Sequence, residues 1–296
     1  IAFSDIDFST SPPASETLNS ITALRRDTTT TFTLTSTQQT NIENAFNISA
    51  DTNNTQNGSI NWEYAISQAN IDFLGAGESI IALFTITVKD FTTGLTDTQD
   101  ITITLAGENK TPTLTEGIKD ISESNIAIVD TISVTAEDAN MSDSLTVSVE
   151  SGTYKFNGES PRTMSNTEKA WLILNTTTYL NSVVEDSSTT SNTFNWDFNT
   201  GSKTFNELNT GETVKLVYTI KVIDNAPIQY WSTKTVTVTI TGTNDTPVAV
   251  IDVSNTTENS PITIDILEND TDIDTQDSSA NFTLNNVSIT TNNHSI

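Results

Sequence analysis

The sequence predicts an all-β chain built from tandem β-sandwich modules, and three observations carry that prediction. Apolar and polar residues alternate strictly over long stretches, as in TVTVTITG at 235–242, which is the period of a half-buried strand. The alternating stretches recur at a fixed spacing along the chain. They end in sequences such as GTNDTP at 242–247, where glycine permits a sharp turn and proline cannot continue a central strand.

The repeat is the most informative of these features. NWEY at 61–64 matches NWDF at 195–198, and GAGESIIALFTITVKD at 75–90 matches NTGETVKLVYTIKVID at 209–224, each with an offset of 134 positions. The closing strands, ITITLAGENKTP at 101–112 and VTVTITGTNDTP at 236–247, match with an offset of 135. We therefore expect each alternating strand to place its apolar face in a core between two sheets.

These matches divide the chain into three units. Residues 1–111 form a first unit that lacks its opening strand, residues 112–246 form a complete second unit, and residues 247–296 begin a third. Each of the first two units is also expected to carry one short helical insertion. The basis is that Thr40–Glu43 and Ser165–Glu168 both have the capping-box pattern of a helix start.

Composition narrows the function. There are 38 acidic and 12 basic residues, a formal net charge of −26, so the chain should attract cations rather than nucleic-acid phosphates or an anionic membrane surface. Cysteine is absent, which excludes disulfides, thiolate metal sites and cysteine nucleophiles. No apolar run approaches the ~20 residues of a membrane helix. The chain opens in mid-pattern with IAFSDIDF, so we interpret it as a fragment of a longer protein.

Aromatic and histidine residues give little sign of an enzyme. Trp62 and Trp196 are expected to anchor the two cores, whereas Tyr230 and Trp231 lie in the loop joining the two long strands of the second unit. That pair either begins the final strand and buries one ring, or forms an exposed platform for stacking a sugar. The single histidine, His294, lies in an Asn-rich stretch that is a poor setting for a Ser-His-Asp triad. Every acidic cluster recurs at the ends of the units and none marks a unique cleft, so we predict that the protein is not an enzyme.

Acidic and amide side chains gather where strands end, and they indicate Ca²⁺. Calcium takes about six to eight oxygen ligands from carboxylates, amides, carbonyls and water. Several carboxylates pressed together repel one another unless a cation neutralises them or they take up protons. Zinc is unsuitable because the chain has no cysteine and one histidine. Each residue alone also fits an Asx-turn without a metal, so the prediction concerns the sets.

The candidate ligands fall into three groups. Those expected at the first junction, between the first and second units, are Asp90, Glu108, Asn109, Glu123, Glu137 and Asp138. Those expected at the second junction, between the second and third units, are Asp224, Asn244, Asp245, Glu258, Asp270, Asp272 and Asp274. The equivalent turn of the first unit contains Asp5 and Asp7. Lys110 stands in the first junction where the second has Asp245, and its positive charge should weaken a cation site there.

These motifs resemble a known family. Trp, a Gly-Glu turn, an alternating strand, Asp, and then Val-Thr-Ile-x-Gly-Thr-Asn-Asp-x-Pro resembles the VCBS repeat of large secreted bacterial adhesins, including those of the RTX type. FSDID at 3–7 is similar to the family's Phe-x-Asp-x-Asp start, and residues 248–274 resemble a bacterial cadherin-like domain. The resemblance implies Ig/cadherin-like β-sandwich modules in tandem, calcium at or near the junctions, and an extracellular place on the bacterial cell surface.

Together these observations predict a structural role. The chain would be a calcium-rigidified extender in a bacterial cell-surface adhesin or extracellular filament, and would support adhesion or matrix assembly. Its partners would be calcium, neighbouring modules of the same chain and, in a filament, other copies, with neither nucleic acid nor membrane insertion. The alternative function is a glycan-binding β-sandwich module that uses the loop at 228–233.

Overall fold

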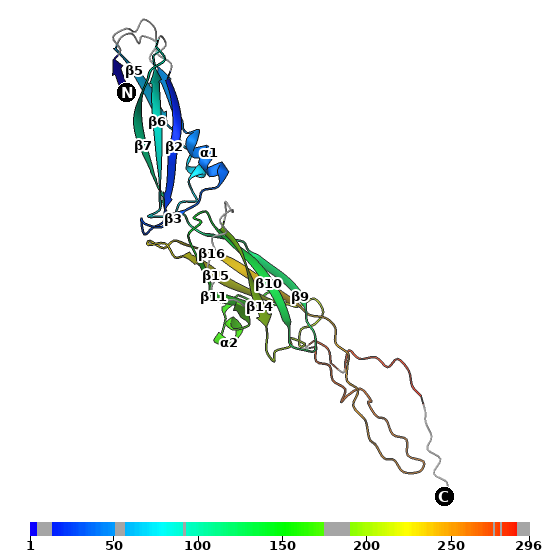
Figure 1. Cartoon of the computed structure of the whole chain (residues 1–296). Helices are drawn as coiled ribbons and strands as arrows, with labels where there is room; N and C mark the ends of the chain where they lie inside the picture. Colours follow the sequence, from blue (N-terminus) through cyan, green and yellow to red (C-terminus); the bar gives the residue numbers. More distant parts are fainter. Residues whose placement is uncertain are drawn as a thin grey trace.

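The computed structural model describes residues 1–4, 14–50, 57–90, 93–174, 190–274, 276–278 and 280–288. The described part contains two β-sandwiches that follow one another along the chain, and a third segment extends beyond the second sandwich (Figure 1). The first sandwich is built from strands β1 to β7 and the second from strands β8 to β16, and no described strand pairs across the two. No helix in the described part is long and apolar enough to span a membrane.

The first sandwich has one sheet of three strands and one of four. The smaller sheet has the order β1-β5-β4, with bounds Ala2–Ser4, Asn57–Tyr64 and Phe46–Ala50. The larger sheet has the order β3-β2-β6-β7, with bounds Thr31–Phe32, Ala14–Leu24, Ser79–Lys89 and Thr96–Ala106. The alternation predicted for β6 is confirmed, because every second residue from Ile80 to Ile86 is buried in the core between the sheets.

The second sandwich has one sheet of four strands and one of five. The smaller sheet has the order β13-β14-β10-β8, with bounds Leu172–Leu174, Thr190–Asn199, Val129–Asp138 and Thr113–Leu114. The larger sheet has the order β12-β11-β15-β16-β9, with bounds Arg162–Thr163, Leu145–Phe156, Thr213–Asp224, Trp231–Thr241 and Gly117–Ser122. The predicted alternation is confirmed in β15, whose residues from Val214 to Val222 are buried at every second position.

The opening strands of the second sandwich connect its two sheets. β8 pairs with β10 in the smaller sheet, and β9 then pairs in parallel with β16 in the larger one. Gly117 lies at the crossing, where an added Cβ would come within 3.2 Å of side chains of Ile132, Val134 and Val236, so only glycine fits without displacing them. Because β9 is parallel to β16, both strands end at the same end of the sandwich, which is the second junction.

The two tryptophans expected in the cores differ in burial. Trp196 is 2% exposed and faces Ile132 of the neighbouring strand β10. Trp62 is 44% exposed and stacks on Phe46 with the ring centroids 5.7 Å apart. The equivalent neighbour in the first sandwich, β1, pairs with β5 only at 57–59, so no residue of β1 covers Trp62. The prediction is correct for Trp196 and wrong for Trp62.

One of the two predicted helix starts is wrong. Helix α1 (Ser36–Glu43) begins after the N-cap Thr35, whose side chain and that of Gln38 form the capping box. The pattern at Thr40–Glu43 therefore lies in the last turn of this helix and not at its start. Both stretches have a threonine followed three residues later by an acceptor side chain, and the earlier stretch forms the cap.

The other helix start is confirmed. Helix α2 (Asn166–Lys169) begins after Ser165, and Ser165 and Glu168 form the predicted capping box. Tyr218 of β15 donates from its hydroxyl to the backbone carbonyl of Glu168 at 3.0 Å, which fixes the helix to the core. A short 3-10 helix, η1 (Gln68–Asn70), precedes β6 in the first sandwich.

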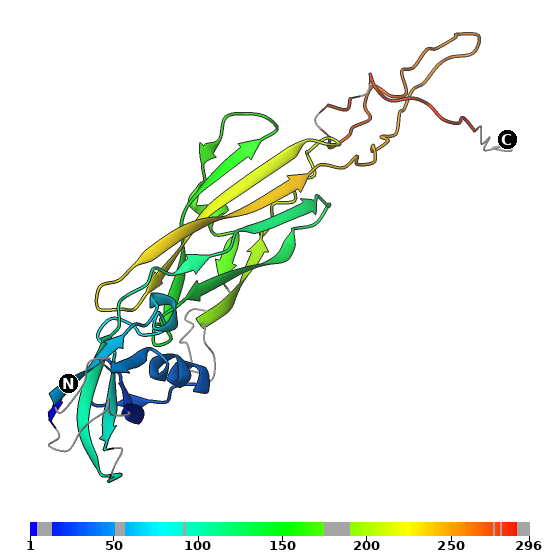
Figure 2. The ribbon, with the colours of Figure 1, turned by 90° about the horizontal axis from the view of Figure 1, so that it is seen from above.

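The third segment has little regular structure among its described residues. After β16 they contain neither helix nor strand, apart from an isolated bridge between Val248 and Thr271. Figure 2 shows this segment leaving from the end of the second sandwich at which β16 ends. Apolar side chains such as Ile251 and Val253 are exposed there. Gln276 of this segment donates hydrogen bonds to the side chains of Asn209 and Glu212 in the second sandwich.

Candidate metal centres at the two junctions

Strand direction decides which candidate ligands share a junction. β15 and β16 are antiparallel, with Thr213 opposite Thr241, so β15 begins at the second junction and ends at the first. Asp224, the last residue of β15, therefore lies at the first junction and not at the second as predicted. Asp90 follows β6 in the same way and lies at the end of the first sandwich that is remote from the first junction.

Glu123 is also reassigned, from the first junction to the second. It directly follows β9, and its backbone N–H donates to the carbonyl of Thr241 at the end of β16. Its Oε1 accepts a hydrogen bond from the backbone N–H of Thr243 at 2.8 Å. The sequence pattern could not reveal this, because the parallel pairing of β9 with β16 is a long-range contact.

Several other predicted ligands do not join an acidic cluster. Glu137 lies on an exposed face of β10 and accepts from the hydroxyl of Ser191. Asp270 accepts from the backbone N–H of Val250 within the third segment. The exposed side chains that likewise stay apart are Glu108, Asn244 and Glu258. Asp5, Asp7 and the unrelated His294 lie outside the described residues.

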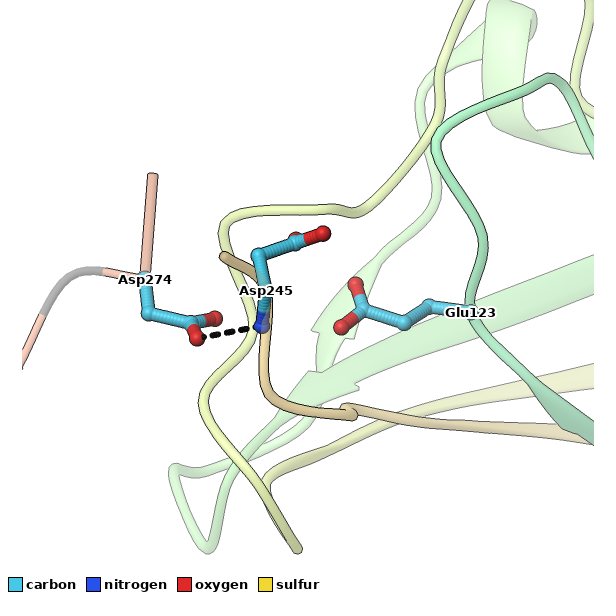
Figure 3. Close-up of side chains that lie close together, drawn as sticks. All are labelled: Glu123, Asp245 and Asp274. Atoms are coloured by element: carbon cyan, nitrogen blue, oxygen red, sulfur yellow. Dashed lines mark hydrogen bonds between the residues drawn. The ribbon is translucent and has the colours of Figure 1, made fainter. Parts of the chain in front are cut away.

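The second-junction cluster consists of Glu123, Asp245 and Asp274, with one carboxylate oxygen of each within 4.8 Å of the others. Figure 3 shows Glu123 and Asp274 approaching Asp245 from opposite sides. The three residues come from different places: the end of β9, the linker after β16, and the third segment. The backbone N–H of Asp245 donates to Oδ2 of Asp274 at 2.9 Å, which fixes the linker against that segment.

Two oxygens of the second-junction cluster are buried with no hydrogen-bond partner among the described residues. They are Oε2 of Glu123 and Oδ1 of Asp274, whose residues are 6% and 2% exposed. Burial raises the pKa of Glu123, and the charges of Asp245 and Asp274 raise it further. Burial likewise raises the pKa of Asp274, with added repulsion from its acidic neighbours. Negative charge at this site is therefore poorly compensated by the protein itself.

The acidic region continues into the third segment. Asp272, Asp274 and Asp277 also bring one carboxylate oxygen each within 4.8 Å of the others. Asp272 accepts from the backbone N–H of Asp274 at 3.0 Å, in the manner of an Asx-turn. Sequence reasoning missed Asp277, although it lies 134 positions after Asp143, which the repeat could have identified.

The first-junction cluster consists of Asp138, Asp143 and Asp224, all of them buried and again within 4.8 Å. Asp143 forms an ion pair with Arg26 of the first sandwich, and this pair crosses the junction. Burial raises the pKa of Asp138 to about 6, and Asp224 adds to the shift while Arg26 opposes it. Sequence reasoning missed Asp143 and Arg26. Nothing in the local sequence of Arg26 marks it as a partner of a residue in the other sandwich.

Asn140 is the central residue of the first junction. Its side chain is fully buried, and its Nδ2 donates to the backbone carbonyls of Asp72, Leu74 and Glu108 at 2.9, 2.9 and 3.1 Å. Its Oδ1 accepts from the backbone N–H of Lys110 at 2.7 Å. One amide of the second sandwich thus joins one loop of the first sandwich to its linker.

Lys110, whose charge is predicted to weaken a metal site at the first junction, forms ion pairs within the first sandwich and linker. Lys110 Nζ lies 2.9 Å from Oδ1 of Asp72 and 4.0 Å from Oε2 of Glu108. Glu108 is therefore the more distant of the two acidic partners of Lys110. Both partners of the closer pair are partly exposed, so this pair contributes little to stability.

The aromatic pair beside the first junction is exposed. β16 begins at Trp231, as one of the two interpretations predicted, but neither ring is buried, since Tyr230 is 41% and Trp231 56% exposed. Lys221 Nζ lies 5.1 Å from the centre of the Trp231 ring. The expectation that one ring would be buried is wrong, because the strand begins at the loop end of the β15–β16 hairpin.

Comparison with known proteins gives distant structural likeness only. No protein-family model matches the sequence, and no curated protein matches it. The structure of human CDH23 EC21-23 is 15% identical over 85% of this chain and 70% of that chain, with a TM-score of 0.35. Protocadherin gammaB7 EC3-6 is 8% identical over 83% of this chain and 44% of that chain, with a TM-score of 0.33. The CooA pilin subunit from enterotoxigenic Escherichia coli is 12% identical over 45% of this chain and 99% of that chain, with a TM-score of 0.25. Scores this low carry no inference about function.

Proposed function

We propose that the second junction binds Ca²⁺ and that the chain is a calcium-stiffened extender of an extracellular bacterial adhesin or filament. In this proposal residues 1–111, 112–246 and 247–296 belong to successive modules of the VCBS and cadherin-like type. The observation that carries the proposal is the pair of buried oxygens on Glu123 and Asp274, which no donor of the described residues reaches.

The donor set fits calcium. Glu123, Asp245 and Asp274 supply hard carboxylate oxygens that already lie within one small sphere, and Asp272 and Asp277 stand next to it. No lysine or arginine of the described residues forms an ion pair with the three carboxylates of the second-junction cluster. Calcium accepts irregular sets of oxygen ligands, whereas zinc favours nitrogen and sulfur.

The origin of the three ligands gives the ion a mechanical role. Glu123 belongs to the second sandwich, Asp245 to the linker, and Asp274 to the third segment. An ion held by all three would fix the direction in which the third segment leaves the sandwich. Without the ion the carboxylates repel one another, and the junction should open or take up protons.

Thermal unfolding followed by circular dichroism tests this proposal. In excess chelator the unfolding temperature should be low, and it should rise in ~1–10 mM calcium but not in equal magnesium. With a Kd near 10⁻⁴ M, 10 mM calcium would add about 2.7 kcal/mol to the free energy of unfolding.

A substitution within the cluster makes the test specific to the second junction. Asp274→Asn should unfold at a higher temperature than the wild type in chelator, because it removes one repelling charge, and should lose most of the calcium response. The matched control is Asp120→Asn, an exposed aspartate on β9 outside both clusters, which should keep the full response. Equal calcium responses in the two variants would sink the proposal.

The exposed aromatic pair favours a second candidate function, glycan binding. Tyr230 and Trp231 are exposed, and Lys221 Nζ lies over the Trp231 ring; exposed aromatic rings are surfaces on which a pyranose can stack. A glycan array probed with the wild type and with Trp231→Ala measures this directly. Binding of a defined glycan class that Trp231→Ala abolishes would support the candidate, and an array without binding would remove it.

A further inference from the structure

We propose that the first junction is held without a metal ion, because the amide of Asn140 and the guanidinium of Arg26 do there what calcium does at the second junction. This inference rests on the proposed function only in its statement about the second junction. It goes beyond that function because it gives the chain one permanent joint and one calcium-dependent joint.

The two junctions are built on the same local backbone. Asp138 and Asn140 lie 134 positions before Asp272 and Asp274. The backbone N–H of Asn140 donates to Oδ1 of Asp138 at 2.8 Å, and that of Asp274 donates to Oδ1 of Asp272 at 3.0 Å. The residues at the centre of the two junctions are therefore held by equivalent turns.

The linkers also bind these central residues in the same way. The backbone N–H of Lys110 donates to Oδ1 of Asn140 at 2.7 Å, and that of Asp245 donates to Oδ2 of Asp274 at 2.9 Å. Lys110 and Asp245 are equivalent in the repeat, 135 positions apart. The remaining polar atom of each side chain, Nδ2 of Asn140 and Oδ1 of Asp274, therefore takes the equivalent place.

These two equivalent atoms have opposite hydrogen-bonding character. Nδ2 of Asn140 donates to three backbone carbonyls of the first sandwich and its linker. Oδ1 of Asp274 is an acceptor, and it is buried without a hydrogen-bond partner among the described residues. A carboxylate oxygen that faces other oxygens needs a bound cation to offset their repulsion. An amide nitrogen needs none, because its N–H groups donate to the oxygens directly.

Arg26 is the second group that takes the place of a metal ion at the first junction. Its Nη2 forms an ion pair with Asp143 and lies 3.4 Å from Oγ of Ser142, both in the second sandwich. The register of the strand pairs places Ala23 opposite Ile80 and Phe156 opposite Val214, which are equivalent pairs. Three residues further along the chain, the first sandwich has Arg26 and the second has Glu159.

Asp224 in the first-junction cluster is also satisfied by protein donors. Its Oδ1 accepts from the backbone N–H of Ala226, and its Oδ2 accepts from the backbone N–H of Tyr230 and from Nδ2 of Asn109, each at 3.0 Å. Asn109 lies in the linker, so this contact again joins the linker to the second sandwich. The first junction should therefore stay closed in chelator.

Distances between spin labels measure each junction separately. The chain has no cysteine, so exposed sites can be changed to cysteine and labelled without background. Thr37→Cys with Thr146→Cys reports on the first junction, and Thr146→Cys with Glu268→Cys reports on the second. We expect the first distance distribution to be the same in chelator and in calcium, and the second to narrow in calcium.

Substitution of the arginine gives the sharper result. Arg26→Ala should at least double the width of the distance distribution across the first junction in chelator. The matched control is Arg25→Ala, whose ion pair with Glu78 lies within the first sandwich and should leave the distribution unchanged. A wild-type first junction that broadens in chelator as much as the second would overturn the inference, because it would mean that Asp138, Asp143 and Asp224 hold a divalent ion.

A double exchange covers the case in which Arg26→Ala does not fold. Lys110→Asp with Asn140→Asp copies the second junction into the first, and the first distribution should then become calcium-dependent. An exchange that leaves the first junction closed in chelator would contradict the inference. If instead the second distribution of the wild type ignores calcium, the proposed function fails while the metal-free first junction still stands.

Discussion

The two junctions of this chain share their turns and linker contacts and differ in the charge at their centres. The first has Asn140 and Lys110 where the second has Asp274 and Asp245, and the first also has Arg26, which forms an ion pair with Asp143 across the junction. A neutral and a basic residue in one junction thus correspond to two acidic residues in the other. The comparison teaches that a repeat can keep its geometry while exchanging a donor for an acceptor, and that this exchange decides whether a cation is needed.

The largest expected effect comes from Asn140→Asp. The new oxygen would face the three carbonyls to which Nδ2 now donates, and a buried charge would replace a satisfied amide. Losses of this kind cost about 3–5 kcal/mol in the free energy of unfolding. Urea denaturation in chelator measures the loss. Calcium should restore part of it if the exchange creates a cation site, whereas equal stability of variant and wild type would break the comparison.

The pH dependence of stability should also separate the junctions. Burial raises the pKa of Asp138 from 3.8 to about 6. The folded state then binds this proton more tightly than the unfolded chain, so the contribution is full below pH 3.8 and is lost as the pH rises through about 6. At about 1.36 kcal/mol per pKa unit, the loss is at most about 3 kcal/mol.

Calcium sharpens that measurement. Burial raises the pKa of Glu123 and of Asp274 as well, so in chelator both junctions lose stability as the pH rises. Saturating calcium should remove the pH-dependent loss of stability that comes from the second junction and leave the loss that comes from Asp138. Asp138→Asn should then flatten the remaining slope of stability between pH 4 and pH 6. A calcium-saturated wild type without that slope would place an ion at the first junction too.

Much of the fold could be predicted from the sequence, because alternation and repetition are local signals. The buried faces of β6 and β15, the anchor Trp196 and the capping box of α2 were all predicted correctly. Trp62 was not, because its exposure depends on which residues of the next strand lie opposite it. The true cap of α1 was missed because two neighbouring stretches, 35–38 and 40–43, satisfied the same rule.

The sequence predicted which kinds of residue form the acidic clusters but not which junction each residue belongs to. Most of the clustered acidic residues were identified, but Asp143 and Asp277 were missed. Asp224 and Glu123 were exchanged between the junctions because strand direction was not taken into account. Asp224 ends a strand that runs antiparallel to β16, and Glu123 ends one that runs parallel to it. Arg26 and Asn140 could not be found from local sequence, because their partners lie in the neighbouring sandwich and linker.

Calcium titration by calorimetry tests the central claim most directly. The chelated wild type should bind calcium with a Kd of ~10⁻⁴–10⁻³ M, the range of extracellular modules. Asp274→Asn at the second junction should abolish this binding, and Asp143→Asn at the first should leave it unchanged. Binding that survives Asp274→Asn and disappears in Asp143→Asn would place the ion at the first junction and contradict the account.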